Sequence, residues 1–258
     1  MEDLIGSRDP KSVIELNRSR RQISSIPPEI GQLVNLKELS LSSNYLTTIP
    51  AEFGQLVNLQ LLYLHDNRLT SIPAELGQLV NLWKLWLGYN QLTSVPAELG
   101  QLVNLQRLML DSNQLTSIPP ELGQLVNLQM LWLNRNQLTS IPTELGQLVN
   151  LQMISLSNNN LTSIPVELGQ LVNLRTLYLS DNQLTSIPAE LGKLIKLWEF
   201  YINNFLYINS TFRNVYRIRT LTKLRKHRYA VEKNIIVLQT IRRRRITLLN
   251  VEAMISYG

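Results

Sequence analysis

The sequence contains no cysteine and only two histidines, His65 and His227. Without cysteine, the chain can form no disulfide, no thiolate metal site and no thiol nucleophile. Secreted repeat proteins commonly close their ends with disulfides, so this absence favours a reducing compartment. The first ten residues, MEDLIGSRDP, include two acids within the first three positions and no apolar run, so we expect no signal peptide. We therefore expect an intracellular protein, cytoplasmic in the first place, with the nucleus as the alternative.

Sequence motifs for catalysis and for membrane insertion are also missing. The chain has no P-loop, no GxGxxG, no HExxH and no GxSxG motif. No stretch approaches the roughly 18 apolar residues of a membrane span. His65 could in principle act as a base, but we interpret it as a surface residue of a strand. We predict a protein that is not an enzyme and that uses no cofactor or metal.

Charge, proline and glycine are unevenly distributed along the 258 residues. Residues 1–202 carry 13 Lys and Arg against 17 Asp and Glu, whereas residues 203–258 carry 12 against 2. The second segment also lacks proline, and its only glycine is Gly258. Such asymmetry predicts two zones with different roles.

A 23-residue repeat dominates the first zone. The stretch LTSIPAELGQLVNL, which begins at Leu69, returns almost unchanged from Leu92 and again from Leu115. The proline of this stretch recurs at Pro27, Pro50, Pro73, Pro96, Pro119, Pro142, Pro165 and Pro188. A fixed period of this length predicts a stacked array in which each repeat touches only its neighbours.

Each repeat predicts one short strand and one short helical turn. Leu62 and Leu64 alternate with Tyr63 and His65, as inward and outward residues of a half-buried strand do. The proline is pre-set to open a turn of α or 3-10 helix. The glycine four residues later, Gly77 in this case, is expected to close the turn with a positive φ. The asparagines 23 residues apart predict a buried, hydrogen-bonded column with a structural role.

The segment Leu59-x-x-Leu62-x-Leu64-x-x-Asn67-x-Leu69 and its copies resemble the leucine-rich repeat family. The 23-residue length with Ile-Pro is similar to the intracellular Ras-group and scribble-like subclass. The resemblance implies an α/β solenoid, a horseshoe with a curved parallel β-sheet on its concave face and short helical or 3-10 turns on its convex face. We expect an N-terminal cap with a degenerate first repeat over 1–22, about eight repeats over 23–202, and a basic tail over 203–258.

The differences between repeats collect at the outward positions of the predicted strands. Aromatic, Met and charged side chains side by side on an exposed face are typical of interaction sites. The alternative is that these aromatics only pack across strands and stabilise the sheet. The predicted binding residues are Tyr63, Trp86, Tyr89, Arg107, Met109, Asp111, Trp132, Arg135 and Tyr178.

The basic tail allows several interpretations. Its candidate patch consists of Arg225, Lys226, Arg228, Arg242, Arg243, Arg244 and Arg245. Such a cluster can be a solvated face, a nuclear-import or nucleic-acid patch, or a contact with acidic lipids. Apolar residues of the same segment could instead cap the open end of the sheet: Leu221, Leu224, Val231 and Ile235.

Together these patterns predict a monomeric, non-enzymatic scaffold that binds a partner protein on its concave face. The resemblance implies small GTPases, kinases or phosphatases as partners, without selecting one. One alternative is a protein that associates with nucleic acid or an acidic membrane through its tail. Another is the recognition subunit of a multi-protein enzyme such as a kinase, a phosphatase or a ubiquitin ligase.

Overall fold

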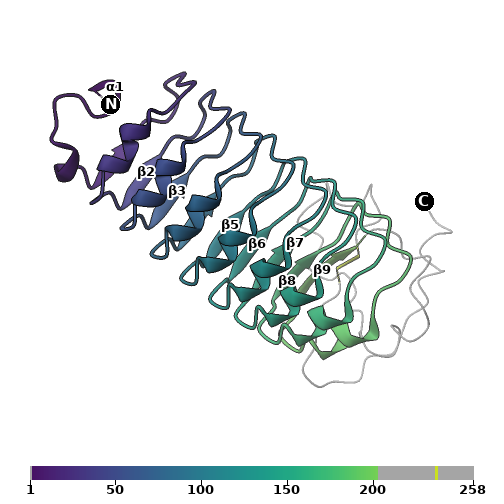
Figure 1. Ribbon diagram of the computed structural model, residues 1–258. Coiled ribbons are helices and arrows are strands. Elements are labelled where there is room, and N and C mark those ends of the chain that lie inside the picture. The colour runs from purple at the N-terminus through teal and green to yellow at the C-terminus, as the bar shows by residue number, and fades with distance from the viewer. Residues whose placement is uncertain (1, 203–235, 238–258) are drawn as a thin grey trace, which may run out of the picture.

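The computed structural model describes residues 2–202 and 236–237, which form a row of stacked coils (Figure 1). The strands are β1 Glu15–Asn17, β2 Glu38–Ser40, β3 Leu61–Tyr63, β4 Lys84–Trp86, β5 Arg107–Met109, β6 Met130–Trp132, β7 Met153–Ser155, β8 Thr176–Tyr178, β9 Glu199–Ile202 and β10 Ile236–Val237. A short helix α1, Glu2–Ile5, lies at the N-terminus. The 3-10 helices are η1 Pro10–Ser12, η2 Pro28–Gln32, η3 Ala51–Gln55, η4 Ala74–Gln78, η5 Ala97–Gln101, η6 Pro120–Gln124, η7 Thr143–Gln147, η8 Val166–Gln170 and η9 Ala189–Lys193.

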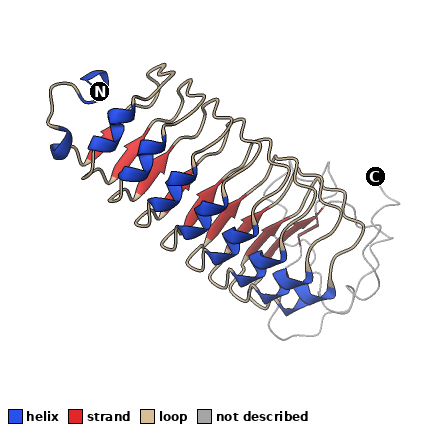
Figure 2. Cartoon of the chain, viewed as in Figure 1, coloured by secondary structure: helices blue, strands red, loops and turns tan. Residues whose placement is uncertain are grey.

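The first nine strands form one parallel sheet in chain order. Each strand pairs with the next in a register shift of 23 residues, so Tyr63 lies beside Trp86 and Trp86 beside Met109. The strands lie along one side of the coil and the 3-10 turns along the other (Figure 2). This is the predicted leucine-rich-repeat solenoid, with the curved sheet on the concave face and 3-10 turns on the convex face.

The two ends of the sheet differ from its middle. β1 belongs to the 1–22 segment and pairs with β2, while Val13 and Leu16 of that segment are buried in the core. At the other end β10 pairs with β9 in the antiparallel direction. A strand therefore lies beyond β9, but the four residues proposed to cap the end are outside the described part of the chain, and their role stays a prediction.

The core consists of the inward leucines of successive repeats. Leu62, Leu64 and Leu69 are fully buried, and so are their counterparts in the neighbouring repeats. Each coil alone would leave these side chains in water, so stacking supplies the apolar burial that stabilises the fold. The outward neighbours Tyr63 and His65 are only partly buried, which confirms the predicted alternation.

A column of buried asparagines ties the coils together. The side-chain amide of Asn90 donates to the carbonyl oxygens of Leu64 and Leu87 at 3.0 Å. Its Oδ1 accepts from the backbone N–H of Leu69 at 3.0 Å. Backbone groups that the coil leaves without partners are satisfied in this way, as the sequence predicted. The same pattern recurs at Asn44, Asn67, Asn113, Asn136, Asn159 and Asn182.

The prediction for the repeat glycine was wrong. A positive φ occurs at only one glycine of the described chain, Gly6, and not at the glycines of the 3-10 turns. The reason for glycine is instead the close approach of the next repeat. A Cβ on Gly146 would lie 2.6 Å from the carbonyl oxygen of Glu167, so any side chain there would separate the two turns.

Candidate functional site

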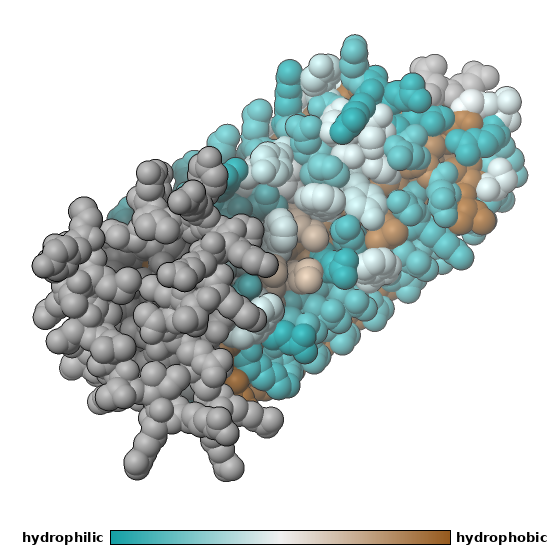
Figure 3. All heavy atoms as spheres, turned by 180° about the vertical axis from the view of Figure 1, so that it is seen from behind, coloured by the Kyte–Doolittle hydropathy of each residue, from teal (hydrophilic) through white to brown (hydrophobic). Residues whose placement is uncertain are grey.

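A groove of about 460 Å³ lies on the concave face toward the C-terminal end of the sheet. Its walls come from five consecutive repeats, from the one that contains β4 to the one that contains β8. Figure 3 shows the molecule from behind, where brown apolar side chains form separate spots among teal polar ones. The lining residues are Tyr89, Asp111, Trp132, Asn134, Arg135, Met153, Ser155, Ser157, Asn158 and Tyr178. Five of the nine predicted binding residues are therefore brought together.

The larger side chains of the groove come from two kinds of backbone position. Trp132 and Tyr178 stand at outward positions of β6 and β8. Tyr89 and Arg135 occupy the turn just after their strands, with left-handed φ angles of 55° and 56° respectively. This conformation is unusual for residues with side chains. Both side chains are exposed at the rim of the groove.

Specific contacts hold the aromatic walls in place. The indole N–H of Trp132 donates to Sδ of Met153 at 3.2 Å. The hydroxyl of Tyr178 donates to Oε2 of Glu199 at 3.2 Å, and its ring stacks on Tyr201 with 4.8 Å between centroids. Burial and the negative charge of Glu199 raise the pKa of Tyr178 to about 12. The Tyr178 hydroxyl therefore remains a hydrogen-bond donor at neutral pH.

Asp111 is the carboxylate of the groove. Its side chain is only 5% exposed, and Oδ1 has no hydrogen-bond partner. Burial raises the pKa of Asp111 above its ordinary value, while its own backbone N–H, the charge of Arg135 and the hydroxyl of Ser112 act in the opposite direction. A buried acceptor without a donor is costly, and Oδ1 has almost no solvent-accessible surface, so the open groove does not reach it.

A second aromatic group lies nearer the N-terminus. The ring of His65 stacks on Trp86 with 4.1 Å between centroids. The rings of Tyr63 and His65 form a T-shaped pair with 6.5 Å between centroids. Nζ of Lys84 lies 4.8 Å from the ring centre of Tyr63 and 5.0 Å from that of Trp86. Burial lowers the pKa of His65, which keeps the imidazole neutral at pH 7. Tyr63 and Trp86, both predicted binding residues, thus belong to this cluster rather than to the groove.

The expectation that Met109 is exposed was wrong, and its role in binding stays a prediction. Only 8% of Met109 is exposed, because it lies between Trp86 and Trp132 on the neighbouring strands. Arg107, also predicted as a binding residue, lies with its guanidinium 5.7 Å from the ring centre of Trp83, on another column. Neither residue lines the groove.

Sequence reasoning missed the polar half of the groove. Asn134, Ser157 and Asn158 occupy the same outward columns as Asp111 and Arg135, but small polar residues were not selected. Met153 was passed over as well, although it stands beside Met130 in the outward column and contacts Trp132. The column position was the available signal for all of them.

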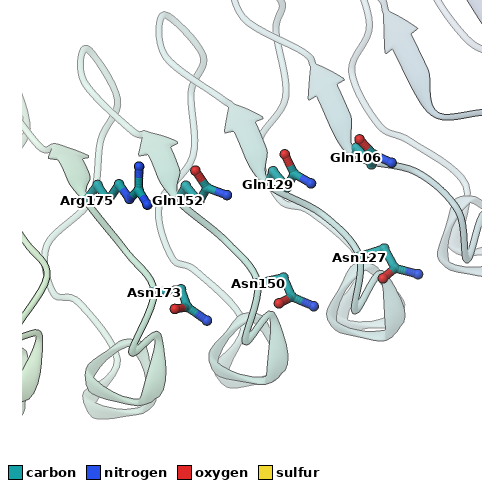
Figure 4. Close-up of a pocket in the computed structure, with 7 residues that line it drawn as sticks. All are labelled: Gln106, Asn127, Gln129, Asn150, Gln152, Asn173 and Arg175. Carbon is teal, nitrogen blue, oxygen red and sulfur yellow. The ribbon is translucent and has the colours of Figure 1, made fainter.

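A second cleft, of about 340 Å³, is lined almost entirely by amides (Figure 4). Gln106, Gln129, Gln152 and Arg175 form one row, and Asn127, Asn150 and Asn173 form the other. Each of these asparagines donates to the carbonyl oxygen of a valine in the preceding repeat, at 2.7 to 2.9 Å. The asparagine side chains therefore stabilise the stack.

The basic tail residues, from Arg225 to Arg245, lie outside the described residues. Within 2–202 and 236–237, no helix is long and apolar enough to cross a membrane. The same part of the chain contains no group of three or more His, Asp or Glu that could hold a metal.

The repeat pattern matches a known family model. The model for the leucine-rich repeat region matches residues 12–141 and 120–254, which together cover most of the sequence. The chain belongs to the leucine-rich repeat family. No curated protein matches it.

Solved leucine-rich repeat structures share the fold. One is a leucine-rich repeat protein of Leptospira interrogans, with 40% identity and a TM-score of 0.67 over 78% of this chain and 56% of that one. Another is the ectodomain of the plant membrane receptor kinase GASSHO1/SCHENGEN3 from Arabidopsis thaliana, in complex with CASPARIAN STRIP INTEGRITY FACTOR 2. It shows 42% identity and a TM-score of 0.68 over 76% and 24% of the two chains. The plant peptide hormone receptor RGFR1, in complex with RGF2, shows 32% identity and a TM-score of 0.62 over 77% and 36%.

Proposed function

We propose that this leucine-rich repeat protein is a binding module without catalytic activity, which holds a segment of a partner protein in its concave groove. The observation that carries the proposal is the groove itself. Side chains from five consecutive repeats converge on it, and they include two aromatic walls, a buried carboxylate and an exposed arginine. Trp, Tyr and Arg are the residue types that contribute most to interface energies.

The comparisons support a peptide or protein as the ligand. Two of the similar structures, GASSHO1/SCHENGEN3 and RGFR1, hold named ligands, although the chain spans only 24% and 36% of their lengths. The 23-residue Ile-Pro repeat favours the Ras-group or scribble-like subclass and, with it, an intracellular scaffold in signalling. Small GTPases, kinases and phosphatases are the partner classes to test first.

The test is a capture experiment with one substitution and one matched control. We expect intact protein, immobilised and exposed to a cell lysate, to retain a defined partner that Trp132→Ala loses. Trp198→Ala is the control, because Trp198 is 51% exposed and does not line the groove. Circular dichroism of each variant shows that the fold is kept.

Three outcomes separate the alternatives. A partner that is lost by Trp132→Ala and kept by Trp198→Ala places binding in the groove and supplies the identity of the partner. Equal capture by all three proteins would show that the groove is not the binding site. Retention of nucleic acid alone would instead favour the basic tail.

A further inference from the structure

The cleft in Figure 4, which we call the amide cleft, is separate from the groove. Its volume is about 340 Å³, and it is lined by three glutamines, three asparagines and Arg175. Figure 4 shows the glutamines beside the starts of the strands and the asparagines beside the 3-10 turns. Groove residues such as Asn134 and Ser157 lie beyond the carboxyl ends of their strands, at the opposite edge of the sheet. No residue lines both sites.

The glutamine row has hydrogen-bonding capacity that the fold does not use. The side chains of Gln106, Gln129 and Gln152 form no hydrogen bond with another described residue, although all three are partly buried. In the other row, Nδ2 of Asn150 donates to the carbonyl oxygen of Val126, which leaves its Oδ1 as an acceptor. The cleft therefore offers both donors and acceptors along its length.

One end of the cleft shows that these asparagine oxygens accept a donor where one is present. Nζ of Lys196 donates to Oδ1 of Asn173 at 2.6 Å. Lys196 stands where the preceding repeats have asparagine. Asn127 and Asn150 are followed by asparagine at this position, and no such donor from a described residue reaches their Oδ1 atoms. A ligand in the cleft can supply it.

Tryptophans stand at both ends of the glutamine row. Trp83 occupies this column one repeat earlier, and its carbonyl oxygen accepts from the backbone N–H of Gln106 at 2.9 Å. Trp198 occupies it at the other end, and its backbone N–H donates to the carbonyl oxygen of Arg175 at 3.0 Å. The side chain of Trp198 is 51% exposed. The column therefore continues beyond the amides to an aromatic side chain at each end.

The composition of the amide cleft favours a sugar over a protein or a nucleic acid. Residues that dominate protein interfaces are aromatic or fill desolvated pockets, and none of the lining residues is aromatic or apolar. A phosphate backbone is bound by several cations, whereas the described lining residues include a single one, Arg175. Sugar hydroxyls both donate and accept, as the amides do. The apolar C–H face of a pyranose ring also packs well on an exposed indole such as that of Trp198.

We propose that the amide cleft binds a straight, neutral oligosaccharide of equatorially linked hexoses, which lies along the column from Trp83 to Trp198. One hexose unit of such a chain matches the strand spacing of about 4.8 Å, so successive units meet the side chains of successive repeats. An extended peptide matches less well, because its backbone groups on one face recur every two residues, at about 6.6 Å. The glutamine amides bind the hydroxyls, and Trp198 packs against the terminal ring. This inference does not depend on the protein partner of the groove.

The probe is cellohexaose, a straight hexasaccharide of glucose, titrated into the full chain by isothermal titration calorimetry. Replacement of Gln129 and Gln152 together by alanine should weaken binding by about 10-fold or more, because the hydrogen bonds of both amides are lost. The control is the pair Gln124→Ala and Gln147→Ala, which removes exposed glutamines of the same two coils that do not line the cleft. It should leave the affinity unchanged. Maltohexaose, which has the same sugar units in a curved chain, should bind more weakly.

Several results would overturn the proposal. They are no binding of cellohexaose to the intact protein, unchanged affinity after the Gln129 and Gln152 substitutions, and equal binding of maltohexaose. Trp132→Ala keeps this inference apart from the proposed function, because it should bind cellohexaose normally while losing the partner of the groove. Trp198→Ala should show the reverse, with weaker sugar binding and an unchanged partner. Loss of cellohexaose binding with Trp132→Ala would place the sugar in the groove and contradict the inference. Circular dichroism verifies that each variant is folded.

Discussion

A Cβ atom on Gly88 would lie 2.6 Å from Oδ1 of Asp111, so the glycine of one repeat makes space for the carboxylate of the next. Real Cβ atoms do not approach another heavy atom so closely. The two residues therefore depend on each other, although they are 23 positions apart in the sequence. A pair of this kind should show coupling in stability measurements.

The substitution Gly88→Ala tests that dependence. In the intact sequence we expect it to lower the free energy of unfolding by about 1–3 kcal/mol, because the added methyl group displaces the carboxylate. In the Asp111→Ser background the loss should be smaller by about 1 kcal/mol. Urea unfolding followed by circular dichroism gives the free energy of unfolding of the intact protein, of the two single variants and of the double variant. Equal losses in the two backgrounds would show that the residues are independent.

The pH dependence of stability tests the burial of Asp111. Its folded pKa is raised, chiefly by burial, so the folded state binds the proton more tightly than the unfolded state does. The stabilising contribution of that proton is present below the unfolded pKa, about 3.9, and is lost as the pH rises through the folded pKa. Replacement by serine removes this loss.

We therefore expect the stability of Asp111→Ser relative to the intact protein to increase as the pH rises above about 4, and then to level off. Melting temperatures between pH 4 and pH 8 provide the measurement. Ser157→Ala, at the same column, has no titratable group and should differ from the intact protein by a constant amount. A constant difference for Asp111→Ser as well would contradict a raised pKa.

The architecture could be predicted because it repeats. Leucines at inward positions and one asparagine per repeat determine the coil regardless of the partner, and the structure buries both sets as expected. Features that depend on two neighbouring repeats could not be predicted from one. Met109 is buried because Trp86 and Trp132 lie on both sides of it on the neighbouring strands. Reading the outward position of one repeat alone does not show how much its two neighbours bury it.

The same limit explains the site. The outward columns correctly predicted that Tyr89, Asp111, Trp132, Arg135 and Tyr178 lie on one face, and the structure brings them together. The structure places Tyr63 and Trp86 in a separate cluster with His65. The sequence could not predict this cluster, because the stacking of these rings depends on side-chain conformation. That Oδ1 of Asp111 lacks a partner is also a property of the packed structure.

Gly146→Ala tests the stacking of the convex turns. A methyl group there would meet the carbonyl oxygen of Glu167 at 2.6 Å, and a backbone atom cannot move aside alone. We expect a loss of about 1–3 kcal/mol in the free energy of unfolding. Thr143→Ala is the control, since Thr143 is exposed in the same turn. An unchanged melting temperature for Gly146→Ala would mean that the turns can separate freely.

Asn113→Ala tests the asparagine column in the middle of the sheet. The side chain of Asn113 accepts from the N–H of Leu92 at 3.0 Å and donates to the carbonyl of Leu87 at 3.0 Å. Removal leaves the N–H of Leu92 buried without a partner, at about 1–3 kcal/mol. The carbonyl of Leu87 keeps the hydrogen bond from Asn90. Asn182→Ala removes the same kinds of bond, but Asn182 is only partly buried, so water can replace some of them. We expect Asn113→Ala to lower the urea midpoint clearly more than Asn182→Ala does. Equal effects at the two positions would show that burial does not set the strength of the column.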